Sequence, residues 1–407
     1  MRNHQTVTLP NGLRIIHESS ETDVVYCGFV VCAGTRNEDS ADSGMAHFCE
    51  HLSFKGTQRR KSWQITNGLE RVGGDLNAYT TKEATVYYAA VLKQDFPRAV
   101  DLLCDIVFHS IYPQREIDKE IEVICDEIKS YEDSPAELIF DEFEEMIFRG
   151  HPMGRSILGN ANRLHEYRTE DALRFTKRYY TPHNMAFFVF GDVDFKRIER
   201  LLLRATSDVS DSAYEKPVVL LPEYVAEERE VLKQTHQAHV MIGTRAYSAY
   251  DNRRIGLFLL NNLLGGPGMN SRLNVALREH NGLVYTVESF LTSYTDTGEW
   301  GVYFGCDEHD IARCRRLVLK ELHRLCDKPL SQAQLSAAKK QLKGQIGISC
   351  DNLEGYALSM GKTFAHYGHY RDVHRLYEQI DALTPDFLLQ ISQDIFDESQ
   401  LTTLVYR

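Results

Sequence analysis

The sequence lacks any long hydrophobic run. No stretch of 18 or more apolar residues occurs in the chain, whereas a helix that crosses a bilayer needs about 20 such residues. The first five residues are polar, and the hydrophobic segment of a signal peptide does not follow them. We therefore expect a cytoplasmic protein with no membrane partner.

Cysteine pairs are also lacking. The nine cysteines are odd in number and scattered, and no Cys-x-x-Cys pair occurs among them. Free thiols in a reducing compartment fit this pattern better than a disulfide framework or a thiolate metal site. The pattern again favours the cytosol.

Positive charge is in deficit. The chain carries 46 Lys and Arg residues against 58 Asp and Glu residues, which gives a formal net charge of −12. Nucleic-acid-binding proteins usually present a basic surface. We therefore expect no nucleic-acid partner, whereas peptides that carry positive charge are compatible with this chain.

The length and the order of elements indicate two related domains. A chain of 407 residues exceeds the usual size of one hydrophobic core. The polar segment 211–222 is predicted to link a domain of residues 1–210 to a domain of residues 223–407. Stretches of the second half correspond to stretches of the first: 238–243 to strand 24–33, 254–264 to a helix ending near residue 54, 298–306 to the strand after Asn77, and 401–406 to strand 185–190. This self-similarity suggests internal duplication.

The most informative motif lies in residues 44–52. His47 and His51 are four residues apart, so a helix places both on one face, about 5–6 Å apart at Cβ, where both rings can turn towards one metal ion. Glu50 shares that face, where it could take a proton from an attacking water molecule. The order His-x-x-Glu-His is the inverzincin signature. Polar residues at 39–43 supply N-cap candidates for this helix.

A third ligand is needed to support this interpretation, because the five-residue pattern arises by chance in roughly a few per cent of chains of this composition. Residues 113–130 have the periodicity of a helix with one buried side. Glu120 and Glu127, two turns apart, border the buried side. A candidate third ligand therefore lies on this helix.

With these residues the chain resembles the inverzincin metallopeptidase family of pitrilysin, insulin-degrading enzyme and mitochondrial processing peptidase, in its small two-domain bacterial-type branch. In that family the third ligand is a glutamate 76 residues after the second histidine, which is Glu127 here. A glutamate seven positions earlier supports a ligand histidine, and Glu120 matches it. The resemblance implies one Zn²⁺ per chain, held by His47, His51 and Glu127. It also implies an α+β fold of two homologous domains, each a mostly antiparallel sheet packed with several helices.

The resemblance extends to Asn77 and Ala78. In the family, the strand that these residues match is a sheet edge to which an extended substrate adds as a further strand. From the residues alone, without the metal motif, an ordinary edge strand is the preferred interpretation. The resemblance therefore predicts that Asn77 and Ala78 bind substrate.

A further motif lies in the second half. The glycine-rich stretch 265–273 leads to Arg278 and Tyr285. It could cradle a phosphate, although the P-loop pattern is absent. In the resembled family, an arginine and a tyrosine seven positions apart reach the substrate, and the tyrosine hydroxyl can donate a hydrogen bond to an oxyanion. From the residues alone, Arg278 could be a surface ion-pair partner and Tyr285 a strand-packing residue.

The second copy of the repeat lacks the metal motif. When the two halves are aligned on the helix end, His47, Glu50 and His51 fall opposite Phe258, Asn261 and Asn262, in that order. Neither phenylalanine nor the asparagine amide is a usual zinc ligand. We therefore expect a zinc site in the first domain only.

These features predict a zinc metalloendopeptidase that hydrolyses peptides or unfolded polypeptide segments inside a closed chamber, with Glu50 as general base. Because one chain carries both motifs, we expect a homodimer in which Arg278 and Tyr285 of one subunit serve the metal site of the other. The alternatives are a non-catalytic peptide-binding protein and a partner subunit of a heterodimeric processing protease. The sequence does not reveal the natural substrate or the preferred cleavage site.

Overall fold

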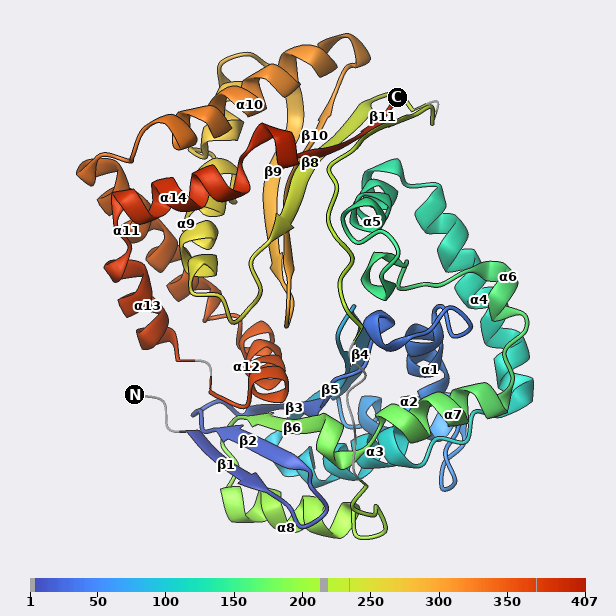
Figure 1. The fold of residues 1–407 in the computed structure, drawn as a ribbon. Helices are drawn as coiled ribbons and strands as arrows, with labels where there is room; N and C mark the ends of the chain where they lie inside the picture. Colours follow the sequence, from blue (N-terminus) through green and yellow to red (C-terminus); the bar gives the residue numbers. More distant parts are fainter. Residues whose placement is uncertain (1–3, 213–218, 234, 371) are drawn as a thin grey trace. The chain divides into compact units, whose positions relative to one another are not determined.

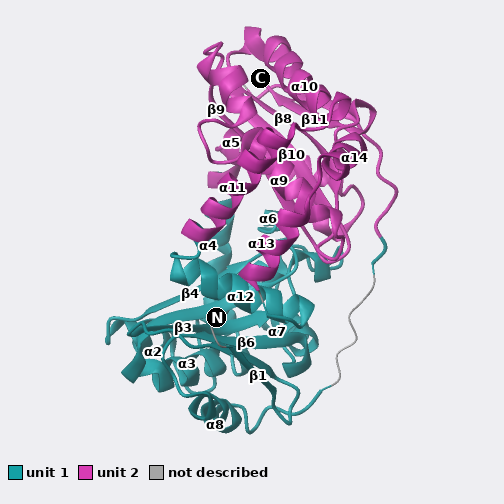
Figure 2. Cartoon of the chain, turned by 90° about the vertical axis from the view of Figure 1, so that its left-hand side faces the viewer, with its two compact units in different colours: residues 1–129, 155–220, 349–371 teal, residues 130–154, 221–348, 372–407 magenta. Residues whose placement is uncertain are grey.

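The computed structural model describes residues 4–212, 219–233, 235–370 and 372–407. The chain divides into two compact units, each built from three segments (Figure 2). Unit 1 comprises residues 1–129, 155–220 and 349–371, and unit 2 comprises residues 130–154, 221–348 and 372–407. The domain boundaries expected from the sequence stay a prediction, and positions 213–218 of the expected linker lie outside the described residues.

Unit 1 is organised around a six-stranded sheet (Figure 1). The strands β2 and β6 are parallel, and all other neighbours are antiparallel. The central strands are rich in Val, Phe and Tyr, which suit a pleated surface that is covered on both faces. In spatial order the strands are β1 (His4–Thr8), β2 (Arg14–Glu18), β6 (Met185–Phe190), β3 (Val24–Val31), β5 (Thr85–Leu92) and β4 (Asp75–Thr80).

Helices cover both faces of this sheet. Side chains alternate along β6, so that Phe187 belongs to the main core, whereas Phe188 faces Gly361 of α12. Figure 1 shows α12 on one face and α3 with α8 on the other. The helices of unit 1 are α1 (Met45–Ser53), α2 (Ser62–Glu70), α3 (Phe96–Phe108), α4 (Gln114–Glu132), α6 (Ala161–Leu164), α7 (Thr169–Tyr179), α8 (Phe195–Ala205) and α12 (Leu353–Tyr367).

Unit 2 contains a five-stranded sheet. Its only parallel pair among the described strands is β11 with β7. One face packs on α5 through a core that includes Phe143, Met241 and Leu404. In spatial order the strands are β7 (Glu228–Val231), β11 (Thr402–Tyr406), β8 (Ala238–Ala246), β10 (Gly298–Cys306) and β9 (Val284–Ser293). The helices are α5 (Pro135–Ile147), α9 (Arg253–Gly265), α10 (Ile311–Asp327), α11 (Gln332–Ser349), α13 (Val373–Ala382) and α14 (Pro385–Ile395).

The two sheets have the same topology. The spatial order β2-β6-β3-β5-β4 of unit 1 matches the order β7-β11-β8-β10-β9 of unit 2, strand for strand along the chain, and the parallel pair falls at the same place. Each unit is a mostly antiparallel sheet packed with helices. The duplicated α+β fold expected from the sequence is therefore confirmed.

Two corresponding helices are exchanged between the halves of the chain. α5 precedes the expected linker yet packs on β8 and β11 of unit 2, while α12 follows the linker and packs on β3 and β6 of unit 1. The exchange is reciprocal, as a duplicated ancestor with swapped helices would produce. No helix in the described ranges combines the length and the apolar character needed to cross a bilayer.

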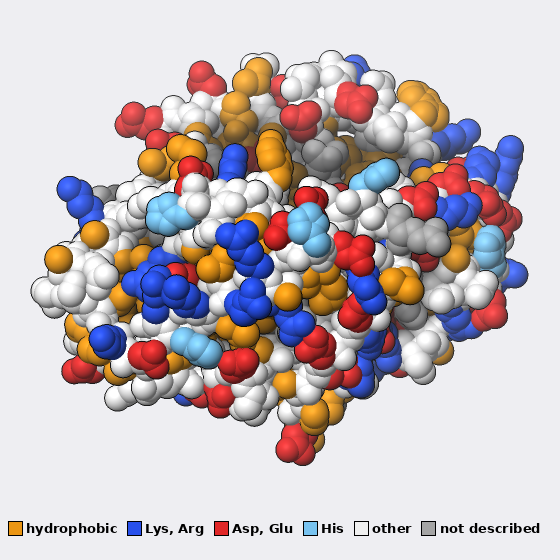
Figure 3. All heavy atoms as spheres, turned by 90° about the horizontal axis from the view of Figure 1, so that it is seen from above, with side chains coloured by type: hydrophobic (Ala, Val, Ile, Leu, Met, Phe, Trp, Pro, Cys, Tyr) orange, Lys and Arg blue, Asp and Glu red, His pale blue; other side chains and the backbone are white. Residues whose placement is uncertain are grey.

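Acidic and basic side chains are interspersed on the face shown in Figure 3. Such mixing is typical of a solvated protein surface. Although the net charge is −12, basic side chains are exposed on this face as well as acidic ones.

Candidate active site

The helix α1 positions the two motif histidines. It begins after Gly44, whose φ of 82° lies in the left-handed region, and a Cβ on Gly44 would come within 2.7 Å of the backbone of Gly159. Glycine is thus required at this position both by conformation and by close approach. His47 and His51 follow one turn apart, with ring centroids separated by 4.5 Å.

The N-terminus of α1 is held by a residue outside the expected capping segment. Gly44 at the N-cap has no capping side chain, so the prediction that one of residues 39–43 caps the helix is wrong. Instead, the buried carboxylate of Glu38 accepts hydrogen bonds from the backbone N–H groups of Gly44 at 2.8 Å and Ala46 at 2.9 Å. Burial raises the pKa of Glu38 to about 8, although both hydrogen bonds oppose this shift.

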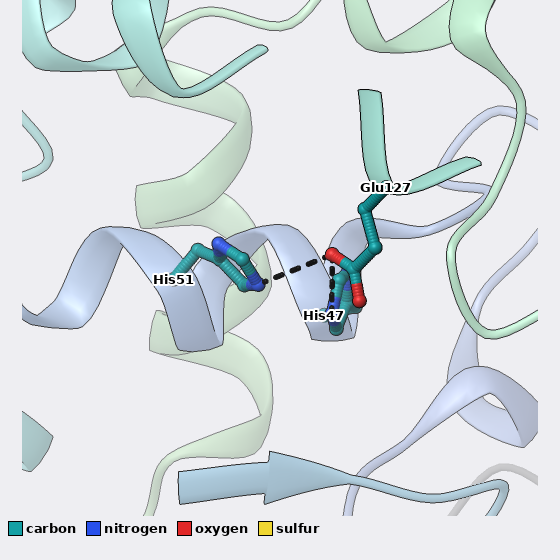
Figure 4. Close-up of side chains that lie close together, drawn as sticks. All are labelled: His47, His51 and Glu127. Atoms are coloured by element: carbon teal, nitrogen blue, oxygen red, sulfur yellow. Dashed lines mark ion pairs between the residues drawn. The ribbon is translucent and has the colours of Figure 1, made fainter. Parts of the chain in front are cut away.

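Glu127 on α4 faces both histidines (Figure 4). One of its carboxylate oxygens lies 3.8 Å from Nε2 of His47 and 3.7 Å from Nε2 of His51. These distances are too long for hydrogen bonds. Two imidazole nitrogens and one carboxylate oxygen thus surround a common point without bonding to one another.

The protonation of His47 is consistent with a ligand role. Burial, followed by the neighbouring charge of His51, lowers the pKa of His47 to about 3. Its imidazole is therefore neutral near neutral pH, with a nitrogen lone pair available for a metal ion. Within the described residues, its buried Nδ1 has no hydrogen-bond partner, so nothing competes for either nitrogen.

Glu120 orients His51. Nδ1 of His51 donates a hydrogen bond to the Glu120 carboxylate at 3.0 Å, and Lys55 pairs with the other oxygen at 2.6 Å. Burial opposes the charged form of His51, but Glu120 and the nearby carboxylates outweigh it and raise the pKa of His51. With Nδ1 engaged, Nε2 is the nitrogen that faces Glu127.

Glu50 lies beside this group with a hydrogen-bond partner of its own. Its side chain is 8% exposed, and Oε2 accepts a hydrogen bond from the hydroxyl of Thr80 at 2.6 Å. Burial raises the pKa of Glu50, while the Thr80 hydrogen bond and His51 lower it. A carboxylate with a raised pKa can both accept and return a proton near neutral pH.

Thr80 and Glu38 are the site residues that sequence reasoning missed. Thr80 was detectable in principle, because it follows Ala78 by two positions on the same strand and therefore shares its face. Glu38 has no comparable signal. It precedes the helix by several residues, and only the path of the intervening loop returns its carboxylate to the helix N-terminus.

Asn77 and Ala78 occupy the edge strand β4. They lie opposite Tyr88 and Tyr87 of β5, and β5 is the only strand that pairs with β4 among the described residues. The outer side of β4 therefore has backbone groups available to an additional strand. α1 packs against the same strand, so this edge runs next to the helix that carries the two histidines.

Arg278 and Tyr285 belong to unit 2, whereas all other predicted site residues belong to unit 1. The Arg278 guanidinium lies 5.5 Å from the centre of the Tyr285 ring, and Tyr285 is 78% exposed. Both line a hollow of about 500 Å³ together with Asn262 and the glycine-rich turn. The structure thus brings the two residues together at an accessible position.

The corresponding helix of unit 2 has a structural role instead. Asn261 of α9 donates a hydrogen bond to the carbonyl oxygen of Ser289 at 3.2 Å and accepts one from the indole N–H of Trp300 at 3.0 Å. Its amide therefore ties α9 to β9 and β10. The described part of unit 2 offers one other grouping of potential ligands, the largely exposed Asp307, His309 and Asp310, which lies outside α9.

The group on unit 1 fits a tetrahedral zinc ion. Zinc ligand bonds of about 2.0–2.2 Å place neighbouring ligand atoms roughly 3.3 Å apart, and the separations of 3.7 and 3.8 Å exceed this value by only a few tenths of an ångström. A zinc ion held by these two nitrogens and one oxygen would keep a position for water or substrate, as catalytic zinc sites do.

Two family models match the chain. Residues 14–161 match the family described as insulinase (peptidase family M16), and residues 168–342 match the peptidase M16 inactive domain. The chain belongs to peptidase family M16.

Individual relatives include proteins named as zinc proteases. The chain is 32% identical to an uncharacterized zinc protease of Streptomyces coelicolor, over 95% of this chain and 86% of the relative. It is 30% identical to one of Bacillus subtilis over 98% and 97%. The beta subunit of mitochondrial-processing peptidase from Saccharomyces cerevisiae is 32% identical over 95% and 87%.

Solved structures show the same fold. A protease from Helicobacter pylori superimposes with a TM-score of 0.91 at 22% identity, covering 100% of this chain and 99% of the other. A peptidase M16 inactive domain from Pseudomonas fluorescens also gives a TM-score of 0.91, at 17% identity and with 99% and 97% coverage. The chain therefore has the fold of these two solved structures.

Proposed function

We propose that the protein is a zinc metalloendopeptidase that hydrolyses peptides or unfolded polypeptide segments. The observation that carries this proposal is the convergence of His47, His51 and Glu127 on one point, with Glu50 beside them. Family membership and the names of the relatives support it.

In this proposal His47, His51 and Glu127 hold one Zn²⁺ per chain, and Glu120 keeps His51 in the required tautomer. Zinc, when bound, supplies a Lewis acid that polarises the scissile carbonyl and lowers the pKa of a coordinated water molecule. Burial of His47 keeps its imidazole neutral and therefore available for coordination.

Glu50 acts as the general base and then as the general acid. Its carboxylate takes a proton from the attacking water and delivers it to the nitrogen of the leaving amine. The hydroxyl of Thr80 holds one carboxylate oxygen, which leaves the other for proton transfer. Burial raises the pKa of Glu50 and so favours uptake of the proton from the attacking water.

The substrate is bound as an extended strand along β4, where Asn77 and Ala78 supply backbone hydrogen bonds. Arg278 holds the substrate, and the hydroxyl of Tyr285 donates a hydrogen bond to the oxyanion that develops at the carbonyl. We further propose a cytoplasmic homodimer in which these two residues serve the metal site of the other subunit. Mixing inactive Glu50→Gln and Tyr285→Phe subunits should then restore part of the activity, whereas no recovery in proven mixed dimers would contradict action between subunits.

The central experiment combines zinc analysis with cleavage of a quenched fluorescent peptide. The purified chain should contain close to one zinc per chain and cut the peptide alone. Glu50→Gln should retain zinc and lose activity by about 10²–10⁴-fold, the usual contribution of a general base. Glu122→Gln, an exposed carboxylate on α4, is the matched control and should behave as wild type. Near-normal turnover in purified Glu50→Gln would refute the assignment.

A second candidate function is that of a subunit in a heterodimeric processing protease. It is favoured by the similarity to a protein named as the beta subunit of such a peptidase. A purified chain that binds zinc but cuts no peptide until a second chain is added would support this candidate. A chain that binds peptide but neither zinc nor a partner would instead be a non-catalytic peptide-binding protein.

A further inference from the structure

The two histidines of α1 are held in different ways. Glu120 orients the ring of His51 by accepting a hydrogen bond from its Nδ1 at 3.0 Å. Histidine ligands in metal sites usually have such a partner for the second ring nitrogen. The buried Nδ1 of His47, in contrast, has no hydrogen-bond partner among the described residues. The position of the His47 ring therefore depends on packing and on the backbone of α1 that carries it.

His47 lies in the first turn of α1. It is the third residue of a helix that begins at Met45. The N–H groups of a first turn have no partner within the helix, and helix ends fray. A ligand at this position therefore needs a backbone that is fixed from outside the helix.

The carboxylate of Glu38 fixes this backbone. One oxygen accepts a hydrogen bond from the N–H of Gly44 at 2.8 Å, and the other accepts one from the N–H of Ala46 at 2.9 Å. Ala46 directly precedes His47. An N-cap side chain usually performs this function, but Gly44 at the N-cap has none, since a Cβ there would come within 2.7 Å of the backbone of Gly159. A carboxylate also interacts favourably with the positive end of the helix dipole.

Glu38 is itself held firmly. The residue is 2% exposed. Its backbone carbonyl oxygen accepts a hydrogen bond from the guanidinium of Arg155 at 2.9 Å, and its N–H donates to the carbonyl oxygen of Thr35 at 3.1 Å. All of these residues belong to unit 1, as α1 does. A buried side chain on a fixed backbone can hold its partners within a narrow range of positions.

We propose that Glu38 is a positioning residue for the metal site: by fixing the first turn of α1, it sets the position of His47 relative to Glu127. Glu38 acts on His47 through the backbone, as Glu120 acts on His51 through the ring. In this proposal Glu38 touches neither the substrate nor the metal ion. Its hold on the helix stands on the contacts of unit 1, whereas the consequence for zinc rests on the proposed function.

The test compares Glu38→Gln with wild type by competition for zinc with a chelator at neutral pH. The glutamine amide can accept from one of the two N–H groups but directs its own N–H₂ at the other. Zinc affinity should therefore fall by about 10–100-fold, as is usual when an outer partner of a ligand is lost. Asp39→Asn, which changes an exposed carboxylate in the same loop, is the matched control and should bind zinc as wild type.

Glu38→Asp is the second variant. It keeps both carboxylate oxygens on a shorter side chain and should weaken zinc binding by a smaller factor than Glu38→Gln. If Glu38→Gln does not fold, Glu38→Asp gives the comparison with wild type.

Further measurements distinguish positioning from a general loss of stability. Amide exchange of the zinc-free protein should become faster at residues 44–48 in Glu38→Gln, and less so at residues 50–53. At saturating zinc, kcat should fall while KM stays unchanged, because Glu38 does not touch the peptide. Asn261→Ala removes two buried hydrogen bonds in unit 2. It controls for lost stability and should change neither the zinc affinity nor the exchange at residues 44–48.

The proposal is overturned by any of three results: wild-type zinc affinity in folded Glu38→Gln, equal amide exchange at residues 44–48 in Glu38→Gln and wild type, or equal loss of zinc affinity in Asn261→Ala. The last result would assign the effect to the stability of the whole chain. A wild type that binds no zinc would overturn both the positioning role and the proposed function. If zinc binds as expected but no peptide is cut, the proposed function fails and the positioning role remains.

Discussion

The two units share one topology and differ in the chemistry of one helix. Along the chain, α1 of unit 1 lies between β3 and β4, and α9 of unit 2 lies between the corresponding strands β8 and β9. α1 packs against the edge strand β4, and α9 packs against the edge strand β9. On α1 the polar side chains face a point shared with Glu127, whereas on α9 Asn261 bonds to the sheet. The comparison teaches that the scaffold does not require the two histidines and the glutamate of α1. Removing them from α1 should therefore cost activity, and removing their counterpart from α9 should cost stability.

The largest expected effect is on the proposed metal ligands of unit 1. Glu127→Gln should release most of the zinc and lower turnover by about 10³-fold or more, because a metal ion supplies several kcal/mol of transition-state stabilisation. Zinc analysis and the peptide assay measure both effects, with Glu122→Gln on the same helix as control. Full zinc content in Glu127→Gln would show that the carboxylate is not a ligand.

The next effect concerns Tyr285 of unit 2, the proposed donor to the oxyanion. Tyr285→Phe should lower kcat by about 10²–10³-fold, because one donor to the oxyanion is removed, while zinc content stays normal. The melting temperature should not change, because the ring is 78% exposed. Normal kcat in this variant would assign Tyr285 to surface packing only.

Asn261 tests the structural side of the comparison. Asn261→Ala removes the partner of two buried groups, the indole N–H of Trp300 and the carbonyl of Ser289, and should lower the free energy of unfolding by about 2–4 kcal/mol. Glu50→Gln, at the aligned position of α1, should change it by less than about 1 kcal/mol, since an amide can still accept from Thr80. Urea unfolding of both variants decides whether the two helices have diverged in this way.

The smallest expected effect is a shift in pH dependence. The Thr80 hydrogen bond favours the charged form of Glu50 and lowers its pKa against the effect of burial. Thr80→Val removes that bond, so the pKa of Glu50 should rise and the acid limb of the kcat/KM profile should move to higher pH. Thr81→Val, at the adjacent position after β4, is the control. An unchanged or lowered acid limb in Thr80→Val would contradict the assignment of Glu50 as the base.

Much of the fold was predictable because its signals are local or repeated. The strands follow from β-branched and aromatic runs, the repetition of their order predicted internal duplication, and the family resemblance predicted the α+β fold. The exchange of α5 and α12 was not predictable. Each is an amphipathic helix, and its sequence indicates that one side is buried but does not indicate which sheet covers that side. Contacts between residues far apart in the chain decide that choice.

The amino-acid sequence by itself determined the spacing of His47, Glu50 and His51, since helical periodicity alone puts them on one face. It also determined that α9 carries Phe258, Asn261 and Asn262 at the corresponding positions. Tertiary structure alone decided that Glu127 meets the histidines, that Glu38 holds the start of α1 and that Thr80 contacts Glu50. Local periodicity acts over a few residues, whereas these contacts depend on how separate helices and strands pack, which no short stretch of sequence encodes.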